Sequence, residues 1–177
     1  MASRRRRGKT VAIVMAGLFI VILLLEMVAI FAPAILGYER THRDIKLVFY
    51  VPRERLQSLE TLAPEVAKRV GAKSYTVKTL DTGNASVVAI VAYVRGEPVA
   101  VLMAPGGVGA ESLATTLSKL IEYGMGLPGN ETAFYLGGDK VYRIQRNTTY
   151  IVAVLQQFFT RIAALQANQT AAKAHGG

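Results

Sequence analysis

Residues 86–103 read SVVAIVAYVRGEPVAVLM and decide the fold of the domain in which they lie. Two apolar runs, Val87–Val94 and Val99–Met103, flank the turn Arg95-Gly96-Glu97-Pro98. Short runs rich in β-branched residues and joined by a glycine-containing turn predict a β-hairpin. The runs are apolar on both of their faces, so we expect the hairpin to form the buried centre of a sheet.

The segment upstream of the hairpin predicts a strand, a helix and a second strand. Ile45–Val51 is rich in β-branched and aromatic residues, and Ser74–Leu80 alternates as a strand does. Arg53–Gly71 has helical periodicity; Pro64 is expected to start a second helical piece and Gly71 to stop the helix. The expected apolar face of this helix consists of Leu56, Leu59, Leu62, Val66, Ala67 and Val70.

A glycine-rich loop and another helix follow the hairpin. The loop is Pro105–Gly109, and the helix is expected over Ala110–Tyr123 with Gly124 at its end. Free N–H groups at a helix N-terminus favour anions. The loop lacks the Lys-Ser/Thr pair of a Walker loop, and Glu111 would repel a phosphate, so we interpret it as a tight structural turn.

The end of the chain predicts a short hairpin and a long helix. The hairpin is Phe134–Leu136 and Val141–Ile144, the helix spans about Thr149–Ala167, and residues 168–177 are expected to be a disordered tail. The helix carries an apolar seam that either packs on its own sheet or meets a partner or another copy of the chain. The seam consists of Ile151, Leu155, Phe158, Ile162 and Leu165.

These elements give the order β-α-β-β-β-α-β-β-α, which predicts an α/β sandwich over residues 45–167. The hairpin, its Arg95-Gly96-Glu97 turn, the glycine loop and the following helix resemble the C-terminal half of the thioredoxin-like fold over Ser86–Tyr123. Ile45–Leu80 would supply the opening β-α-β unit of that fold. The Cys-x-x-Cys motif of the family is absent, so the resemblance implies no redox activity. A ferredoxin-like arrangement is the alternative.

The N-terminal region predicts a transmembrane signal-anchor helix. Thr10–Leu36 reads TVAIVMAGLFIVILLLEMVAIFAPAIL, which is longer than the roughly 20 residues that a helix needs to cross a bilayer. Residues 1–9 carry Arg4–Arg7 and Lys9 and are expected to stay in the cytoplasm, with 37–44 as a juxtamembrane linker on the other side. This topology predicts a single-pass membrane protein with an extracellular C-terminal domain.

Two other fates of the N-terminus stay open. Ala32-Pro33-Ala34 would supply a small-x-small site for a signal peptidase. Arg7-Gly8 before an apolar helix resembles the leader of archaeal type IV pilins, although Lys9 and Ile13 depart from that family's pattern. Glu26 lies inside the apolar run. We expect it either to contact a partner helix or another copy of the chain, or to lie near the outer leaflet or be protonated.

All four asparagines of the chain lie in Asn-x-Ser/Thr triplets without proline. They are Asn84, Asn130, Asn147 and Asn168. Such triplets also suit turns and helix caps, but the complete set favours N-glycosylation. All four follow the apolar run, which agrees with the predicted topology.

Composition excludes several classes of chemistry. The chain has no cysteine and only two histidines, His42 and His175, so disulfides, thiol catalysis, Cys-ligated zinc and histidine-based sites are not expected. The net charge of +9 includes five cations before the apolar run, and no basic stripe with interleaved aromatics indicates nucleic-acid binding. The sequence points to no cofactor or metal, and the spacing of the carboxylates selects no catalytic pair.

We therefore expect a non-enzymatic, membrane-anchored and N-glycosylated surface protein that acts as an accessory or assembly subunit. Its partners would be the lipid bilayer and either a membrane or surface protein or a second copy of the chain. One alternative is a pilin-like extracellular filament subunit processed after Gly8. The other is a redox-inactive thioredoxin-like domain that binds polypeptide through an exposed apolar groove.

Overall fold

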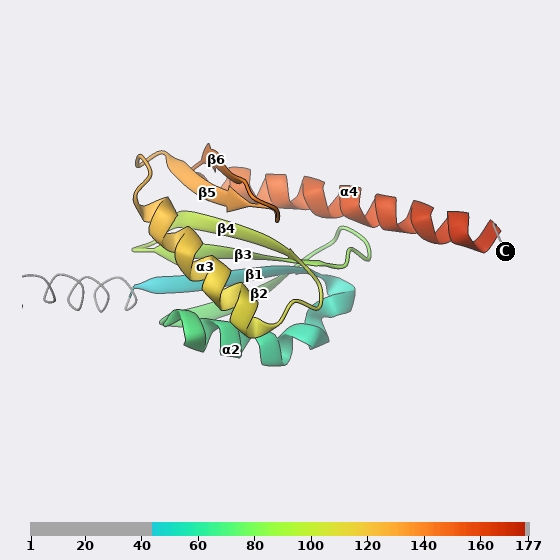
Figure 1. Ribbon diagram of the computed structural model, residues 1–177, viewed down its shortest axis with the longest axis horizontal. Helices are drawn as coiled ribbons and strands as arrows, with labels where there is room; N and C mark the ends of the chain where they lie inside the picture. The colour runs from blue at the N-terminus through green and yellow to red at the C-terminus, as the bar shows by residue number, and fades with distance from the viewer. Residues whose placement is uncertain (1–43, 176–177) are drawn as a thin grey trace, which may run out of the picture. The chain divides into compact units, whose positions relative to one another are not determined.

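The computed structural model describes residues 44–175, which lie within one compact unit and form an α/β domain around a six-stranded mixed sheet (Figure 1). The strand order is β2-β1-β3-β4-β5-β6. The β1/β2 and β4/β5 pairs are parallel, and the other three are antiparallel. The strands are β1 (Ile45–Pro52), β2 (Ser74–Leu80), β3 (Val87–Val94), β4 (Glu97–Pro105), β5 (Glu131–Tyr135) and β6 (Val141–Gln145).

The predicted central hairpin is confirmed, and its turn is tighter than expected. β3 and β4 are joined by Arg95 and Gly96 alone, at φ of 53° and 86°, and Glu97 already belongs to β4. A two-residue turn with both φ angles positive follows the right-handed twist of the strands, which explains the glycine. Most of β1, β3 and β4 is buried on both faces. The edge strands β2 and β6 are largely exposed.

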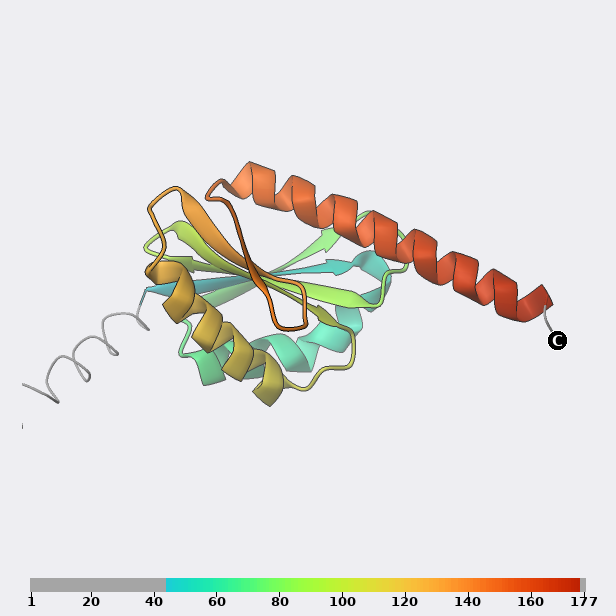
Figure 2. The ribbon, with the colours of Figure 1, turned by 45° about the horizontal axis from the view of Figure 1, so that its top comes forward.

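Helices α2 (Leu59–Val70) and α3 (Ala110–Met125) cover one face of the sheet (Figures 1 and 2). The predicted helix start at Pro64 is wrong: a 3-10 helix, η1 (Arg53–Ser58), comes first, and α2 then runs through Pro64. The missing N–H of Pro64 leaves the carbonyl of the exposed residue Glu60 without its helical partner, and water can reach it there. Leu56 is 44% exposed and does not join the apolar face that was expected for it.

Gly124 does not end the second helix as predicted but lies inside α3. A Cβ at this position would overlap the carbonyl oxygen of Val99 in β4. The glycine is therefore required by the close approach of α3 to the sheet rather than by helix termination. The prediction for Gly71 is confirmed, because it ends α2 in the left-handed conformation at φ 74°.

Helix α4 (Thr148–His175) crosses the opposite face of the sheet and projects beyond it in both ribbon views (Figures 1 and 2). The helix contains residues 168–175, so the prediction of a disordered tail from residue 168 is wrong for this part. Residues 168–175 are rich in alanine, the best helix former, and contain no glycine or proline that would stop the helix.

The predicted anchor helix Thr10–Leu36, its flanks at 1–9 and 37–43, and Glu26 lie outside the described residues. Within residues 44–175, none of the helices is both long and apolar enough to cross a membrane.

Candidate functional site

Helix α4 packs on the sheet near its start, and its middle part, residues 158–165, forms one wall of a groove. Ile151 and Leu155, two members of the predicted seam, are buried in the core with Phe159. Phe159 was missed in the sequence because Phe158 fits the alternating four- and three-residue spacing of the seam. Burial instead continues in four-residue steps from Ile151, as expected where one straight helix lies on a sheet.

The other three seam residues, Phe158, Ile162 and Leu165, line an apolar groove of about 420 Å³. Phe158 also packs on Phe134 of β5, with ring centroids 5.8 Å apart. Leu165 is 58% exposed. The remaining lining residues come from the start of β3, the end of β4, the β5–β6 turn and α4: Val87, Met103, Ala104, Pro105, Leu136 and Arg161.

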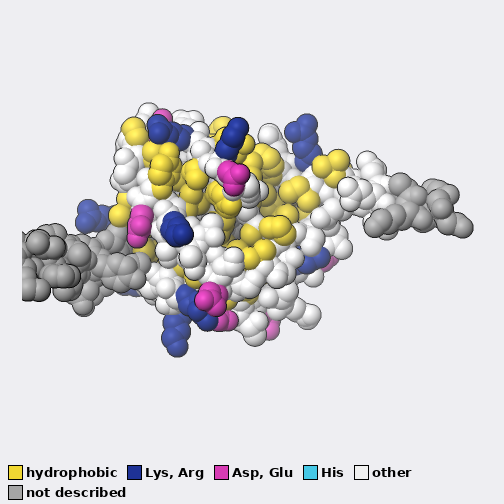
Figure 3. Space-filling view, viewed as in Figure 1, with side chains coloured by type: hydrophobic (Ala, Val, Ile, Leu, Met, Phe, Trp, Pro, Cys, Tyr) yellow, Lys and Arg dark blue, Asp and Glu magenta, His cyan; other side chains and the backbone are white. Residues whose placement is uncertain are grey.

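The surface around the groove is also apolar. In Figure 3, hydrophobic side chains gather in a band from the region of β5 and β6 towards α4, with single basic and acidic groups between them. Val141 and Tyr142 of the edge strand β6 are among the exposed large hydrophobic residues. Apolar surface of this extent on a small domain is typical of a binding surface.

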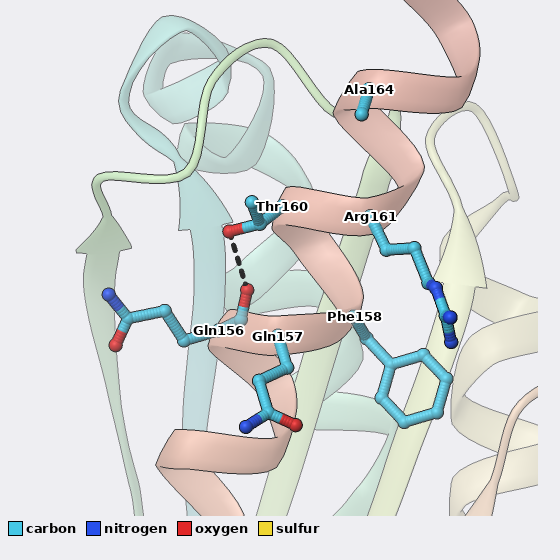
Figure 4. A pocket seen from close by; sticks show the side chains of 6 residues that line it. All are labelled: Gln156, Gln157, Phe158, Thr160, Arg161 and Ala164. Carbon is cyan, nitrogen blue, oxygen red and sulfur yellow. Dashed lines mark hydrogen bonds between the residues drawn. The ribbon is translucent and has the colours of Figure 1, made fainter.

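A second hollow, of about 570 Å³, lies along α4 (Figure 4). Phe158 and Arg161 line both hollows, so the two adjoin on this helix. In Figure 4 the side chains of these two residues leave the helix on the same side. The rest of the lining is mostly polar and consists of Gln156, Gln157, Thr160 and Ala164. The arrangement places amide and guanidinium donors beside an apolar groove, as at the rim of a protein interface.

The second half of α4 is held against the β2–β3 loop. The backbone N–H of Ser86 donates to Oε1 of Gln166 at 3.0 Å. A Cβ added at Gly83 would lie 3.4 Å from the Cβ of Ala163. These contacts fix the α4 wall of the groove relative to the sheet, which preorganises the groove for a ligand.

All four predicted glycosylation asparagines are exposed, and they lie in two groups. Asn130 and Asn147 are close, because the N–H of Arg146 donates to the Asn130 carbonyl at 2.8 Å. Asn84 belongs to the loop that lies beside Ala163 and Gln166, which precede Asn168 on α4 by five and two residues. The groups thus lie near the start of α4 and along its second half.

Two of these triplets also have structural roles. Asn147 caps α4: its Oδ1 accepts the N–H of Tyr150 at 3.0 Å, and its carbonyl accepts the N–H of Ile151 at 2.9 Å. Thr132, the third residue of the Asn130 triplet, is fully buried, and its hydroxyl donates to the carbonyl of Pro98 at 2.7 Å. The exposed amides leave room for glycans, whereas the Thr132 hydroxyl is enclosed by the fold.

Among residues 44–175, no group of three His, Cys, Asp or Glu side chains is placed to hold a metal ion. Two carboxylates form ion pairs, Glu65 with Arg69 at 3.0 Å and Glu131 with Arg143 at 3.6 Å. The glycine loop is bonded to the sheet through the Gly106 N–H and the Ser86 carbonyl at 2.8 Å, and Gly107 has φ 104°. Within residues 44–175, these two carboxylates are therefore paired with arginines, and the loop is tied to the residue before β3.

Burial raises the pKa of Tyr50 to about 12, and the neighbouring hydroxyl of Tyr93, to which Tyr50 is hydrogen-bonded, adds to the shift. Tyr50 lies among the apolar residues beneath α4 and is itself buried. Its phenol is a stabilising part of the core at neutral pH rather than a group poised for proton transfer.

Searches of family models, curated proteins and solved structures find no match to this chain. The thioredoxin-like resemblance and the ferredoxin-like alternative therefore stay predictions.

Proposed function

We propose that this protein is a membrane-anchored, N-glycosylated cell-surface protein that acts as a non-enzymatic accessory or assembly subunit by binding another polypeptide. The observation that carries the proposal is the apolar groove along Phe158, Ile162 and Leu165. A polypeptide-binding domain needs such an exposed groove. Burying its walls against a partner would remove apolar surface from water and so contribute to the affinity.

The N-terminal sequence supports the placement of this domain at a membrane. Its apolar run of 27 residues, the arginines before it and the four Asn-x-Ser/Thr triplets after it agree on one topology. A tether confines the groove to the space near the membrane, which raises the effective concentration of any partner held in the same membrane. An accessory subunit can therefore work through a groove of modest affinity.

Site-specific photo-crosslinking in the membranes of the native host tests the groove. A benzophenone amino acid at Leu165 of the full-length protein should crosslink to a discrete partner or to a second copy, identified by mass spectrometry. Leu56 is the matched control, because it is also a partly exposed leucine (44%) but lies on η1 and does not line the groove. Equal crosslinking at both positions, or none at Leu165, would contradict the proposal.

The intact mass of the protein from native membranes, before and after deglycosylation, tests the anchor and the glycans. A full-length or Met1-trimmed chain with glycan agrees with the proposal. Loss of residues 1–8 would favour the pilin-like filament, and loss of residues 1–34 would indicate a secreted protein. A full-length chain without glycan would show that the four triplets are not modified.

A further inference from the structure

A third hollow lies between η1, the start of α2 and the glycine-rich loop. It has a volume of about 290 Å³. Its walls combine polar and apolar surface in similar amounts, and the apolar part includes Val51, Leu59, Leu62 and Val108. Among the described residues that line it, Arg55 is the only one with a charged side chain. A small hollow with aliphatic side chains and a single cation differs in chemistry from the groove along α4.

The Nε–H group of Arg55 is a buried hydrogen-bond donor. Its Nε is inaccessible to solvent and has no hydrogen bond to any residue that the structure describes. The ion pairs within residues 44–175 join Arg69 to Glu65 and Arg143 to Glu131 and leave Arg55 out. An unmatched buried donor on a charged group costs free energy, so natural structures rarely keep one without a role.

The guanidinium of Arg55 is held against the glycine loop. A Cβ at Gly106 would lie 2.8 Å from Nη1 of Arg55 and 3.1 Å from Oγ of Ser86. The absence of a side chain at Gly106 therefore leaves room for the guanidinium. On the other side, Ser58 fixes the turn of η1 because its hydroxyl donates to the Arg55 carbonyl at 2.7 Å. The backbone of Arg55 is thus fixed by Ser58, and its guanidinium lies beside the glycine loop.

From this geometry we infer that the hollow binds a carboxylate that carries a short apolar chain. A guanidinium has a planar set of donors that matches the two oxygens of a carboxylate, and one cation balances one negative charge. The aliphatic walls would take the apolar chain. The volume suits a small monocarboxylic acid or the terminal residue of a polypeptide with a free C-terminus, which share this chemistry. The site does not depend on the proposed function of the groove.

Titration of the ¹⁵N-labelled full-length protein in detergent micelles with hexanoate tests the inference by NMR. We expect hexanoate to shift the Arg55 Nε–H signal and the Gly106 and Gly107 amide signals with a Kd of about 1 mM, as befits a ligand of this size. Hexanamide has the same chain without the charge and should bind at least about tenfold more weakly.

Two substitutions separate the site from general effects on the fold. Arg55→Met keeps an unbranched side chain and should weaken hexanoate binding at least about tenfold while preserving thermal stability, because it removes the unmatched donor. Arg69→Met removes an exposed arginine of α2 outside the hollow and should leave the Kd unchanged. Equal binding by Arg55→Met, equal binding of hexanamide, or no shift with hexanoate up to about 20 mM would overturn the inference.

A pair of peptides distinguishes the two sources of the carboxylate. Acetyl-Ala-Ala-Leu with a free C-terminus should bind more tightly than hexanoate if the natural ligand is the end of a polypeptide, and its C-terminal amide should not bind. Tighter binding of hexanoate would assign the hollow to a small free acid. Both results support a carboxylate site, and binding of the amidated peptide as tightly as the free acid would overturn it.

Discussion

Gly124 of α3 and Val99 of β4 lie so close that a Cβ on the glycine would overlap the valine carbonyl oxygen. The carbonyl of Gly124 also accepts a hydrogen bond from Nη2 of Arg146, at 3.2 Å. Helix α3, the centre of the sheet and the segment before α4 therefore meet at this glycine.

Gly124→Ala should destabilise the protein by about 1–3 kcal/mol, because α3 must move away from β4 to admit the methyl group. Denaturant unfolding of the full-length protein in detergent measures the loss. Gly126→Ala is the matched control: Gly126 has φ −81° and its added Cβ would make only ordinary contacts, so the change should stay within about 0.5 kcal/mol. Equal effects of the two substitutions would show that the contact with Val99 is unimportant.

The capping role of Asn147 and its proposed role as a glycan acceptor can be separated by three substitutions. Asn147→Ala removes the Oδ1 acceptor and should cost about 1 kcal/mol of stability. Asn147→Asp keeps an acceptor and should cost less, since a negative charge suits the N-terminus of α4. Thr149→Ala keeps the cap but destroys the triplet, so it should remove any glycan at Asn147 with little change in intrinsic stability. Unfolding curves of deglycosylated protein and intact masses report the two effects.

Stability should fall with rising pH between about 10 and 12 because of Tyr50. Burial, with a further contribution from Tyr93, raises the pKa of this phenol from 10.0 to about 12. In that window the unfolded chain releases the proton and the folded chain keeps it, so unfolding becomes more favourable, by about 1–3 kcal/mol at the upper end. Tyr50→Phe should remove this part of the pH dependence, whereas Phe at the exposed Tyr75 should not. An unchanged slope in Tyr50→Phe would contradict the assignment.

Most of the sheet and helix positions were predictable from residue composition or from a clear hydrophobic period. The strand β1 follows from its enrichment in β-branched and aromatic residues, and the buried positions Val66 and Val70 of α2 follow from the helical period of 3.6 residues. The errors occurred where a local signal competed with a tertiary contact. Gly124 has the sequence signature of a helix stop, and only the proximity of Val99 explains why it lies inside α3.

The candidate groove was predictable only in part. The seam on α4 identified Phe158, Ile162 and Leu165, but the opposing wall comes from Val87, Pro105 and other residues distant in sequence. The choice between Phe158 and Phe159 for the core depends on how α4 lies on the sheet. No pattern in the sequence predicted the hollow at Arg55, because a single arginine after a strand is usually a solvated charge.

The burial of Thr132 would set an order of events during biosynthesis if Asn130 carries a glycan as proposed. An enzyme that modifies Asn130 must recognise the hydroxyl two residues later, and in the finished fold this hydroxyl is buried and bonded to Pro98. Sugar transfer at Asn130 would then have to precede the pairing of β5 with β4. Thr149 of the Asn147 triplet is exposed, so modification of Asn147 would not have to precede folding. The ratio of glycan at these two asparagines would record how fast the domain folds in the cell.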